Sequence, residues 1–185
     1  MHTLICGVTQ SGKTTLARLM ARQIAAAGHK VIVRDPVAGT TTAGGGWPDS
    51  ALVFTDDYDW LEYMHDPKNG GAVVIVDEAG DLFGVSDRDL HWMFTKGRHY
   101  GYAMMPICQR PKMVAPNVRG QCGKTYMFRL AQEDAREIGM DMGFSDMHKI
   151  ELDRGDFLVL ESGTPRYSRG NVFQLTGIAQ TKGQL

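Results

Sequence analysis

The 185-residue sequence lacks the features that mark several classes of protein. Its three cysteines are odd in number and show no C-x-x-C spacing, and two of them lie in apolar runs, which favours buried, reduced thiols. The six histidines show no ligand pairing, so no zinc site is expected. No apolar run approaches a membrane span, and the chain starts on a strand pattern rather than a signal peptide. With a net charge of −1, the chain is also not a basic protein that passively coats nucleic acid.

What the sequence does contain begins at residue 7, in the stretch GVTQSGKTT (7–15). Gly7, four residues, then Gly12, Lys13 and Thr14 form the full P-loop pattern. Glycines let successive backbone N–H groups point at phosphate oxygens, and the following helix adds its positive N-terminal end. Lys13 supplies charge for the β- and γ-phosphates, and the Thr14 hydroxyl is a ligand for Mg²⁺. We therefore expect ATP and Mg²⁺ as cofactors. The predicted nucleotide-binding residues are Thr9, Gln10, Ser11, Gly12, Lys13, Thr14 and Thr15.

Strand and helix patterns alternate along the chain, which predicts a single α/β domain over residues 1–185, with a mostly parallel sheet and an antiparallel C-terminal hairpin. A Gly- and Thr-rich loop over 36–50 interrupts this alternation, and Trp47 is interpreted either as part of a surface connection or as a flat contact for a ligand or neighbour. Strands are expected at 3–6, 30–35, 51–56, 72–80, 102–109 and 124–130, with two more between 156 and 175. Helices are expected at 13–28, 56–66, 86–97 and 132–140.

A second phosphate motif lies in the predicted strand AVVIVDEAG (72–80), where Asp77 and Glu78 follow four apolar residues. Asp77 at the carboxyl end of the strand is predicted to hold the Mg²⁺ water shell. Glu78 is predicted to polarise the water that attacks the γ-phosphate, although it could instead cap the next helix. Together with the P-loop about sixty residues upstream, this pair predicts ATP hydrolysis.

Charge is distributed unevenly along the chain. Residues 49–93 contain eleven acids and two bases, whereas residues 96–129 contain seven bases and no acid. The basic side chains either pair with acids on a neighbouring face or subunit, or face phosphates of ATP or of a polynucleotide. Lys112 and Arg119 lie just beyond the strand 102–109, where a loop can project, and are predicted to contact DNA phosphates without sequence preference.

The stretch RHYGYAMMPICQRP (98–111) resembles, without a gap, a segment of the FtsK–HerA superfamily of DNA-pumping ATPases: Arg, two residues, Gly, an apolar strand, then Gln-Arg-Pro. VDEAG (76–80) resembles their Walker B motif, and LDRGDFLVLESG (152–163) resembles a late strand with a Gly-Asp pair. The resemblance implies a RecA-like (ASCE) P-loop core, a homo-oligomeric and hexameric ring, and translocation of double-stranded DNA. By position it implies that Gln109 senses the γ-phosphate.

Arg98 corresponds to the arginine that members of this superfamily present to a neighbour's nucleotide. The predicted helix 86–97 would place Arg98 at the amino end of the next strand. Because nucleotides bind at the carboxyl ends of strands in open α/β sheets, Arg98 would then reach a γ-phosphate only on an adjacent subunit. Lys13, Glu78, Arg98 and Gln109 are thus the predicted catalytic residues, and pairing of Arg98 with an acid of residues 49–93 is the alternative.

The short chain, without a membrane anchor or winged-helix module, is most similar to the genome-packaging ATPases of membrane-containing viruses and phages. This similarity implies work in the host cytoplasm or at the virion or procapsid, with a capsid vertex or portal protein as a further partner. Three alternatives stay open: an assembly or secretion ATPase of filamentous phages, which normally adds a membrane span; a P-loop nucleoside kinase, whose zinc-binding cysteines are missing here; and a nucleotide-binding scaffold that does not hydrolyse ATP.

Overall fold

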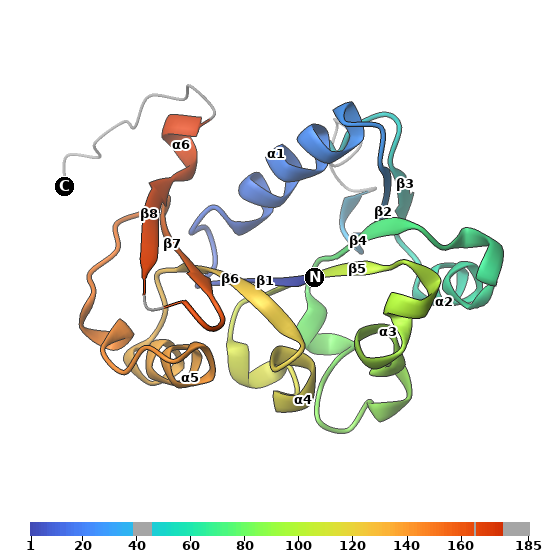
Figure 1. Cartoon of the computed structure of the whole chain (residues 1–185). Coiled ribbons are helices and arrows are strands. Elements are labelled where there is room, and N and C mark those ends of the chain that lie inside the picture. Colours follow the sequence, from blue (N-terminus) through green and yellow to red (C-terminus); the bar gives the residue numbers. More distant parts are fainter. Residues whose placement is uncertain (39–45, 165, 176–185) are drawn as a thin grey trace.

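A computed structural model describes residues 1–38, 46–164 and 166–175 of the chain. Its centre is an eight-stranded sheet with the order β3-β2-β4-β5-β1-β6-β7-β8 (Figure 1). All neighbouring pairs from β3 to β6 are parallel, while β6–β7 and β7–β8 are antiparallel. The strands are β1 (His2–Cys6), β2 (Lys30–Arg34), β3 (Leu52–Phe54), β4 (Ala72–Val76), β5 (Ala103–Cys108), β6 (Cys122–Phe128), β7 (Asp156–Glu161) and β8 (Tyr167–Asn171). The predicted fold class, a mostly parallel sheet with an antiparallel C-terminal hairpin, is confirmed.

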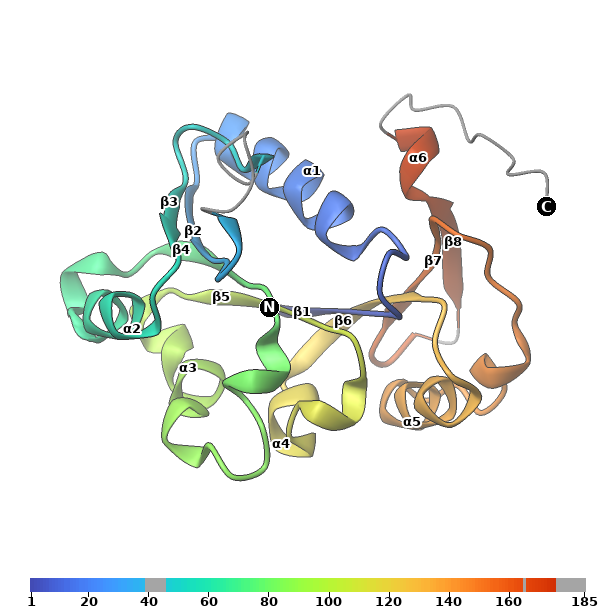
Figure 2. The ribbon, with the colours of Figure 1, turned by 180° about the vertical axis from the view of Figure 1, so that it is seen from behind.

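The helices cover both faces of this sheet, as the two opposite views show (Figures 1 and 2). They are α1 (Lys13–Ala26), α2 (Asp57–His65), α3 (Trp92–Thr95), α4 (Pro116–Arg119), α5 (Gln132–Met142) and α6 (Val172–Leu175). In both views α1 and α6 lie on one side of the sheet, and α2 to α5 lie on the other. Parallel strands need crossover helices, and covering both faces explains why these strands are apolar almost throughout.

Alternate residues of each strand supply two separate cores. Ile5, Val33 and Ile107 pack with Leu16 of α1 on one face. Leu4, Ile32, Val74 and Met104 pack with the larger group of helices on the other face. Burial of such side chains contributes roughly 1.5–3 kcal/mol each, so the strand register is strongly fixed. The consequence for the site is that β1, β4 and β5 end together at one edge of the sheet.

The predicted continuous helix over 86–97 is wrong. The segment forms separate short turns at Arg88–Leu90, Trp92–Thr95 and Gly97–Tyr100. Its polar and aromatic residues are poor helix formers, so tertiary contacts decide its shape. The His91 ring bonds to the Gly84 carbonyl and to Asn117, and Phe94 packs edge-on against Phe83 with ring centroids 4.9 Å apart.

Arg98 therefore does not begin the next strand. It lies in the turn Gly97–Tyr100, and β5 starts only at Ala103, after a left-handed Gly101 with φ 75°. The turn still precedes β5, so Arg98 lies toward the amino ends of the parallel strands.

Candidate functional site: a phosphate-binding edge of the sheet

The P-loop leaves the carboxyl end of β1 and leads directly into α1 (Figure 1). Two of its glycines are dictated by close packing. A Cβ on Gly7 would lie 2.5 Å from Cβ of Phe128, and one on Gly12 would lie 2.7 Å from Cγ1 of Val172. Gly12 also has φ 111°, a conformation that residues with a side chain rarely adopt. The backbone is thus curled by its neighbours before any ligand is considered.

Side chains inside this loop retain hydrogen-bonding capacity. Lys13 is only 8% exposed, and its Nζ donates to the Val8 carbonyl at 3.0 Å. Burial lowers the Lys13 pKa, while the nearby Asp77 and Glu78 carboxylates act in the opposite direction. Ser11 Oγ is buried and has no hydrogen-bond partner within the described ranges. Buried polar groups are normally paired, so these groups fit a bound anion that would supply the missing acceptors.

Thr14 and Asp77 meet at the same edge. The Thr14 hydroxyl donates to Oδ2 of Asp77 at 3.1 Å, and the Glu78 backbone N–H donates to Asp77 Oδ1 at 3.0 Å. Burial raises the Asp77 pKa, and these two hydrogen bonds counteract part of the shift. A hydroxyl beside a carboxylate is the hard-oxygen set that Mg²⁺ uses together with substrate phosphates. The residues present therefore fit a Mg²⁺ ion, with Thr14 and Asp77 as the groups that would hold it.

Glu78 and Gln109 form the third part of the site. Strand β5 lies between β4 and β1, so Gln109 follows β5 at a point between the P-loop and Glu78. Gln109 Nε2 donates to Glu78 Oε1 at 3.2 Å, and its Oε1 accepts from Thr9 Oγ1 at 2.9 Å. Glu78 has a left-handed backbone with φ 51°, which is uncommon for a residue with a side chain. Such strain is often found where a functional side chain is aimed.

Most residues predicted from the phosphate motifs thus come together. A pocket of about 210 Å³ beside the loop is lined by Gln10, Gly12, Lys13, Thr14, Thr15, Arg154 and Phe173. Arg98 is separate from this group: it is exposed, lies before β5 rather than after it, and forms no ion pair among the described residues. Its predicted pairing with an acid of residues 49–93 is therefore not found in the described part of the chain.

Arg154 and Phe173 in this pocket were not predicted as site residues. Arg154 precedes β7 and Phe173 lies in α6, so the C-terminal hairpin supplies one wall of the pocket. The only sequence signal was the Arg-Gly-Asp stretch at 154–156, which resembles a strand of the FtsK–HerA superfamily but carries no phosphate motif.

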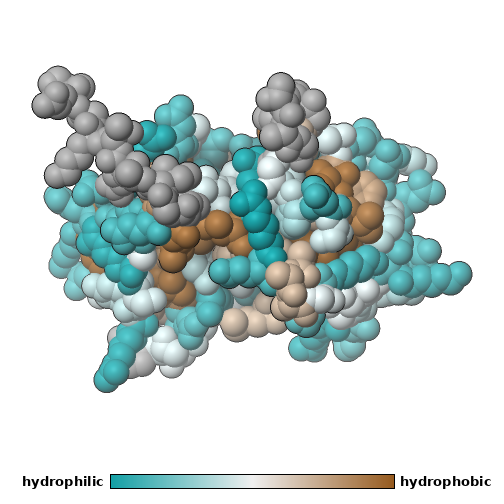
Figure 3. Space-filling model, turned by 90° about the horizontal axis from the view of Figure 1, so that it is seen from above, coloured by the Kyte–Doolittle hydropathy of each residue, from teal (hydrophilic) through white to brown (hydrophobic). Residues whose placement is uncertain are grey.

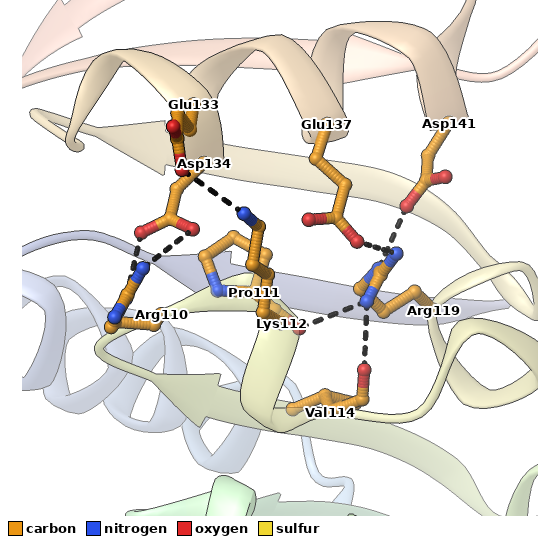
Figure 4. Close-up of polar contacts among 9 residues, drawn as sticks. All are labelled: Arg110, Pro111, Lys112, Val114, Arg119, Glu133, Asp134, Glu137 and Asp141. Atoms are coloured by element: carbon orange, nitrogen blue, oxygen red, sulfur yellow. Dashed lines mark hydrogen bonds and ion pairs between the residues drawn. The ribbon is translucent and has the colours of Figure 1, made fainter. Parts of the chain in front are cut away.

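The basic segment after β5 corrects a prediction (Figure 4). Arg119 is 5% exposed and cannot present its charge to DNA in this conformation. Its guanidinium donates to Glu137 and Asp141 of α5 at 2.5 and 2.7 Å, and to two backbone carbonyls, those of Pro111 and Val114. These four acceptors take four of the five N–H donors of a buried guanidinium, so the expected projecting arginine instead joins its own segment to α5.

Two other bases of this segment also face α5. Arg110 bonds through Nε and Nη2 to Asp134, whose side chain is 1% exposed. Lys112 is 45% exposed and makes a longer contact, 3.4 Å, with the exposed Glu133 (Figure 4). The partners of these bases therefore come from α5 and not from the acidic residues 49–93. Of the two predicted DNA-binding residues, only Lys112 keeps an accessible charge.

Trp47 is likewise not an exposed flat contact. It is 6% exposed, its Nε1 donates to Asp35 Oδ2 at 2.8 Å, and the Arg18 guanidinium lies 5.4 Å from the ring centre. Asp35 is fully buried, and its carboxylate accepts from the indole N–H and from the Val37 backbone N–H, so the indole is part of a paired buried group. The remainder of the predicted glycine-rich loop, 39–45, lies outside the described residues.

Fold and site together define a RecA-like P-loop NTPase. The chain belongs to the zonular occludens toxin (Zot) family, whose model matches residues 48–160. No curated protein sequence gives a significant match. No helix within residues 1–38, 46–164 and 166–175 has the length and apolar character needed to cross a membrane.

Three solved structures place this fold among known ATPases. The genome packaging NTPase B204 from Sulfolobus turreted icosahedral virus 2, in complex with sulfate, is 18% identical with a TM-score of 0.74, over 91% of this chain and 94% of B204. The N-terminal domain of zonular occludens toxin from Neisseria meningitidis is 20% identical with a TM-score of 0.51, over 93% and 96%. The Thermomonospora curvata type VII secretion ATPase EccC is 15% identical with a TM-score of 0.67, over 92% of this chain and 25% of EccC. The predicted resemblance to packaging ATPases is confirmed at the level of fold.

Proposed function

We propose that this protein is an ATP-hydrolysing motor that translocates double-stranded DNA and packages a viral genome into a capsid. The observation that carries the proposal is the near full-length match to the genome packaging NTPase B204, combined with a complete phosphate-binding edge. B204 has also been solved in complex with the ATP analogue AMPPCP.

Each residue of the edge then has a role. Lys13 and the P-loop N–H groups bind the β- and γ-phosphates, and Thr14 with Asp77 would hold a Mg²⁺ ion, which would supply positive charge to the phosphates. Glu78 accepts a proton from the attacking water. Gln109 senses the γ-phosphate, and its contacts with Glu78 and Thr9 connect the base to the P-loop. Positioning and charge stabilisation of this kind supply nearly all the catalysis in phosphoryl transfer.

Arg98 is proposed to act on the nucleotide of an adjacent subunit in a hexameric ring. Its exposure and its place before β5 support this role, because an exposed arginine without an ion pair in the described ranges is available to a neighbour. Arginines supplied in this way contribute on the order of 10³-fold or more to turnover.

Mixing two inactive variants tests Arg98. Arg98→Ala and Glu78→Gln subunits should each be nearly inactive alone, yet mixed rings should regain ATPase activity where an intact Arg98 faces an intact Glu78. The recovered activity should fade on dilution, since it requires assembly. Mixed rings that demonstrably form and stay inactive would show that Arg98 does not act in trans.

A third-strand displacement assay tests translocation itself. A moving motor should strip a triplex-forming strand from a long duplex in the presence of ATP and Mg²⁺, and the Glu78→Gln variant should not. ATP hydrolysis that never displaces the third strand, on duplexes entered from either end, would contradict DNA translocation.

The second candidate is an assembly or secretion ATPase built on the same core. The match to the zonular occludens toxin model and the shared fold of a type VII secretion ATPase favour it. The two functions differ in what the motor responds to: duplex DNA should accelerate hydrolysis by a packaging motor, whereas a secretion motor should respond to a protein substrate.

A further inference from the structure

We infer that Arg154 and Phe173, which no motif assigns, form the nucleoside-side wall of the nucleotide site: Phe173 packs against the nucleoside and Arg154 adds positive charge beside the phosphates. This inference rests on the proposed function, because it extends the P-loop pocket toward the rest of the nucleotide. Both side chains line the same pocket as Gly12, Lys13, Thr14 and Thr15.

The sheet order decides on which side of the P-loop the nucleoside lies. Thr14 and Asp77 mark the Mg²⁺ and γ-phosphate end, and Asp77 follows β4, two strands from β1 on one side. The β7–β8 hairpin lies beyond β6 on the opposite side of β1. A nucleotide with its β-phosphate at Lys13 and its γ-phosphate toward Asp77 and Glu78 must extend its nucleoside away from β4, which is toward the hairpin.

The hairpin is attached directly to the P-loop, so this wall is part of the site. The Gly155 N–H donates to the Ser11 carbonyl at 3.1 Å, and the Val172 N–H donates to the Gly155 carbonyl at 2.8 Å. Val172 itself packs over Gly12. The backbone path from the P-loop to α6 is thus two hydrogen bonds long.

The position of the Phe173 ring is also fixed by its neighbours. A Cβ on Gly155 would lie 2.4 Å from this ring, so only glycine leaves room for it. The Asn171 side chain accepts from the Phe173 and Gln174 N–H groups at 3.0 and 3.3 Å, and it donates to Asp156 at 2.7 Å. Seen from above, apolar surface is present beside hydrophilic surface at the end of the molecule where α6 lies (Figure 3).

Arg154 complements the aromatic ring. Its guanidinium carbon lies 5.7 Å from the centre of the Phe173 ring, and the side chain is exposed, with no ion pair to a described residue. A planar cation resting on an aromatic face keeps its N–H groups available for phosphate oxygens. Arginine and aromatic side chains together suit a ligand that has an anionic end and a flat, apolar end.

Two probes separate the two halves of the ligand in titration calorimetry: Mg²⁺ with the ATP analogue AMPPCP, and Mg²⁺ with inorganic tripolyphosphate. Stacking of a base on an aromatic ring contributes about 1–3 kcal/mol, so Phe173→Ala should weaken analogue binding by about tenfold and leave tripolyphosphate binding unchanged. Arg154→Ala should weaken both probes by about tenfold, as expected for a charged hydrogen bond. Leu175→Ala changes an exposed apolar residue of α6, and Arg166→Ala changes an exposed basic residue at the far end of the β7–β8 hairpin; both are matched controls and should change neither.

The outcomes are distinguishable. Unchanged analogue affinity in Phe173→Ala, with tight binding by the parent protein, would overturn the inference while the proposed function stands. Loss of both probes in Phe173→Ala would also overturn it, because the ring would then act by supporting Gly12 and the loop. A parent protein that binds neither probe would overturn the proposed function itself, and the inference with it.

Discussion

Lys13 and Arg119 are both buried cations, 8% and 5% exposed, yet their surroundings differ completely. Lys13 has a single hydrogen bond, to the Val8 carbonyl, and lies near a buried hydroxyl that lacks a described partner. Arg119 has four acceptors, two of them carboxylates. The phosphate-binding edge therefore keeps capacity for a ligand, whereas the segment braced by α5 has used its capacity within the fold. Availability of a charge, and not its presence in the sequence, separates a binding site from a structural contact.

The largest effects on activity should come from substitutions in the phosphate-binding edge. Glu78→Gln should lower the ATPase rate by about 10²–10⁴-fold and leave nucleotide affinity intact, because a glutamine cannot take the proton of the attacking water. Lys13→Ala should instead weaken binding by about ten- to a hundredfold, since it removes a charged contact to the phosphates. Steady-state kinetics and calorimetry on both variants check this. A glutamine variant that turns over at the parent rate would remove Glu78 from catalysis.

Substitutions in the basic segment that contacts α5 should instead change the stability of the fold. Arg119→Ala leaves two buried backbone carbonyls without a donor and two partly exposed carboxylates without a partner, and should lower the free energy of unfolding by about 2 kcal/mol or more. Lys112→Ala is the matched control in the same segment: its contact is exposed, so it should change stability by less than about 1 kcal/mol. Urea denaturation at constant pH measures both. Equal, small effects at the two positions would mean that Arg119 is not a structural brace.

Lys112 is still predicted to contact DNA phosphates, and this single residue should contribute less to DNA affinity than the two residues first predicted. Lys112→Ala should weaken duplex binding several-fold and equally across sequences, and should lower the slope of log affinity against log salt by about 1 per bound contact. Fluorescence anisotropy at several salt concentrations measures this slope. An unchanged slope would leave Lys112 as a partner of Glu133 alone.

The smallest effect concerns Asp77. Burial raises its pKa, so the folded protein binds a proton more readily than the unfolded chain, and this group's contribution to stability is lost as pH rises through the raised value. Asp77→Asn should therefore stabilise the nucleotide-free protein by about 0.5–1 kcal/mol at pH 7, and the gain should shrink toward pH 4. Thermal melting across this range measures the difference. Destabilisation at pH 7 would show that the Asp77 carboxylate is already compensated.

The sequence predicted which residues of the phosphate-binding edge lie together, because their geometry depends on short-range spacing. Gly7 to Thr15 lie on one strand–loop–helix unit, and Asp77, Glu78 and Gln109 each follow a buried strand. Parallel strands bring such positions to one edge, so motif and topology together place the side chains. The strand order, with β5 between β4 and β1, brings Gln109 between the P-loop and Glu78.

The partners of the basic segment after β5 were predicted wrongly, because they lie on α5, a different element. The basic segment was compared with the acid-rich residues 49–93, although the acids of α5 are no farther from it in sequence. The acids that bind it, Glu133, Glu137 and Asp141, recur every four residues along α5 and so form one stripe of the helix. The spacing of these acids is visible in the sequence, but the sequence does not show which segment packs against this face of the helix. The burial of Trp47 was missed for the same reason, because its contacts are with Asp35 and Arg18 on other parts of the fold.

ATP hydrolysis by the purified chain, measured with and without long duplex DNA, tests the central claim most directly. The account predicts Mg²⁺-dependent release of phosphate to water that long duplex DNA accelerates and that Glu78→Gln abolishes. Transfer of phosphate to an added nucleoside, or hydrolysis that duplex DNA leaves unchanged at every length and concentration, would contradict a DNA-translocating motor.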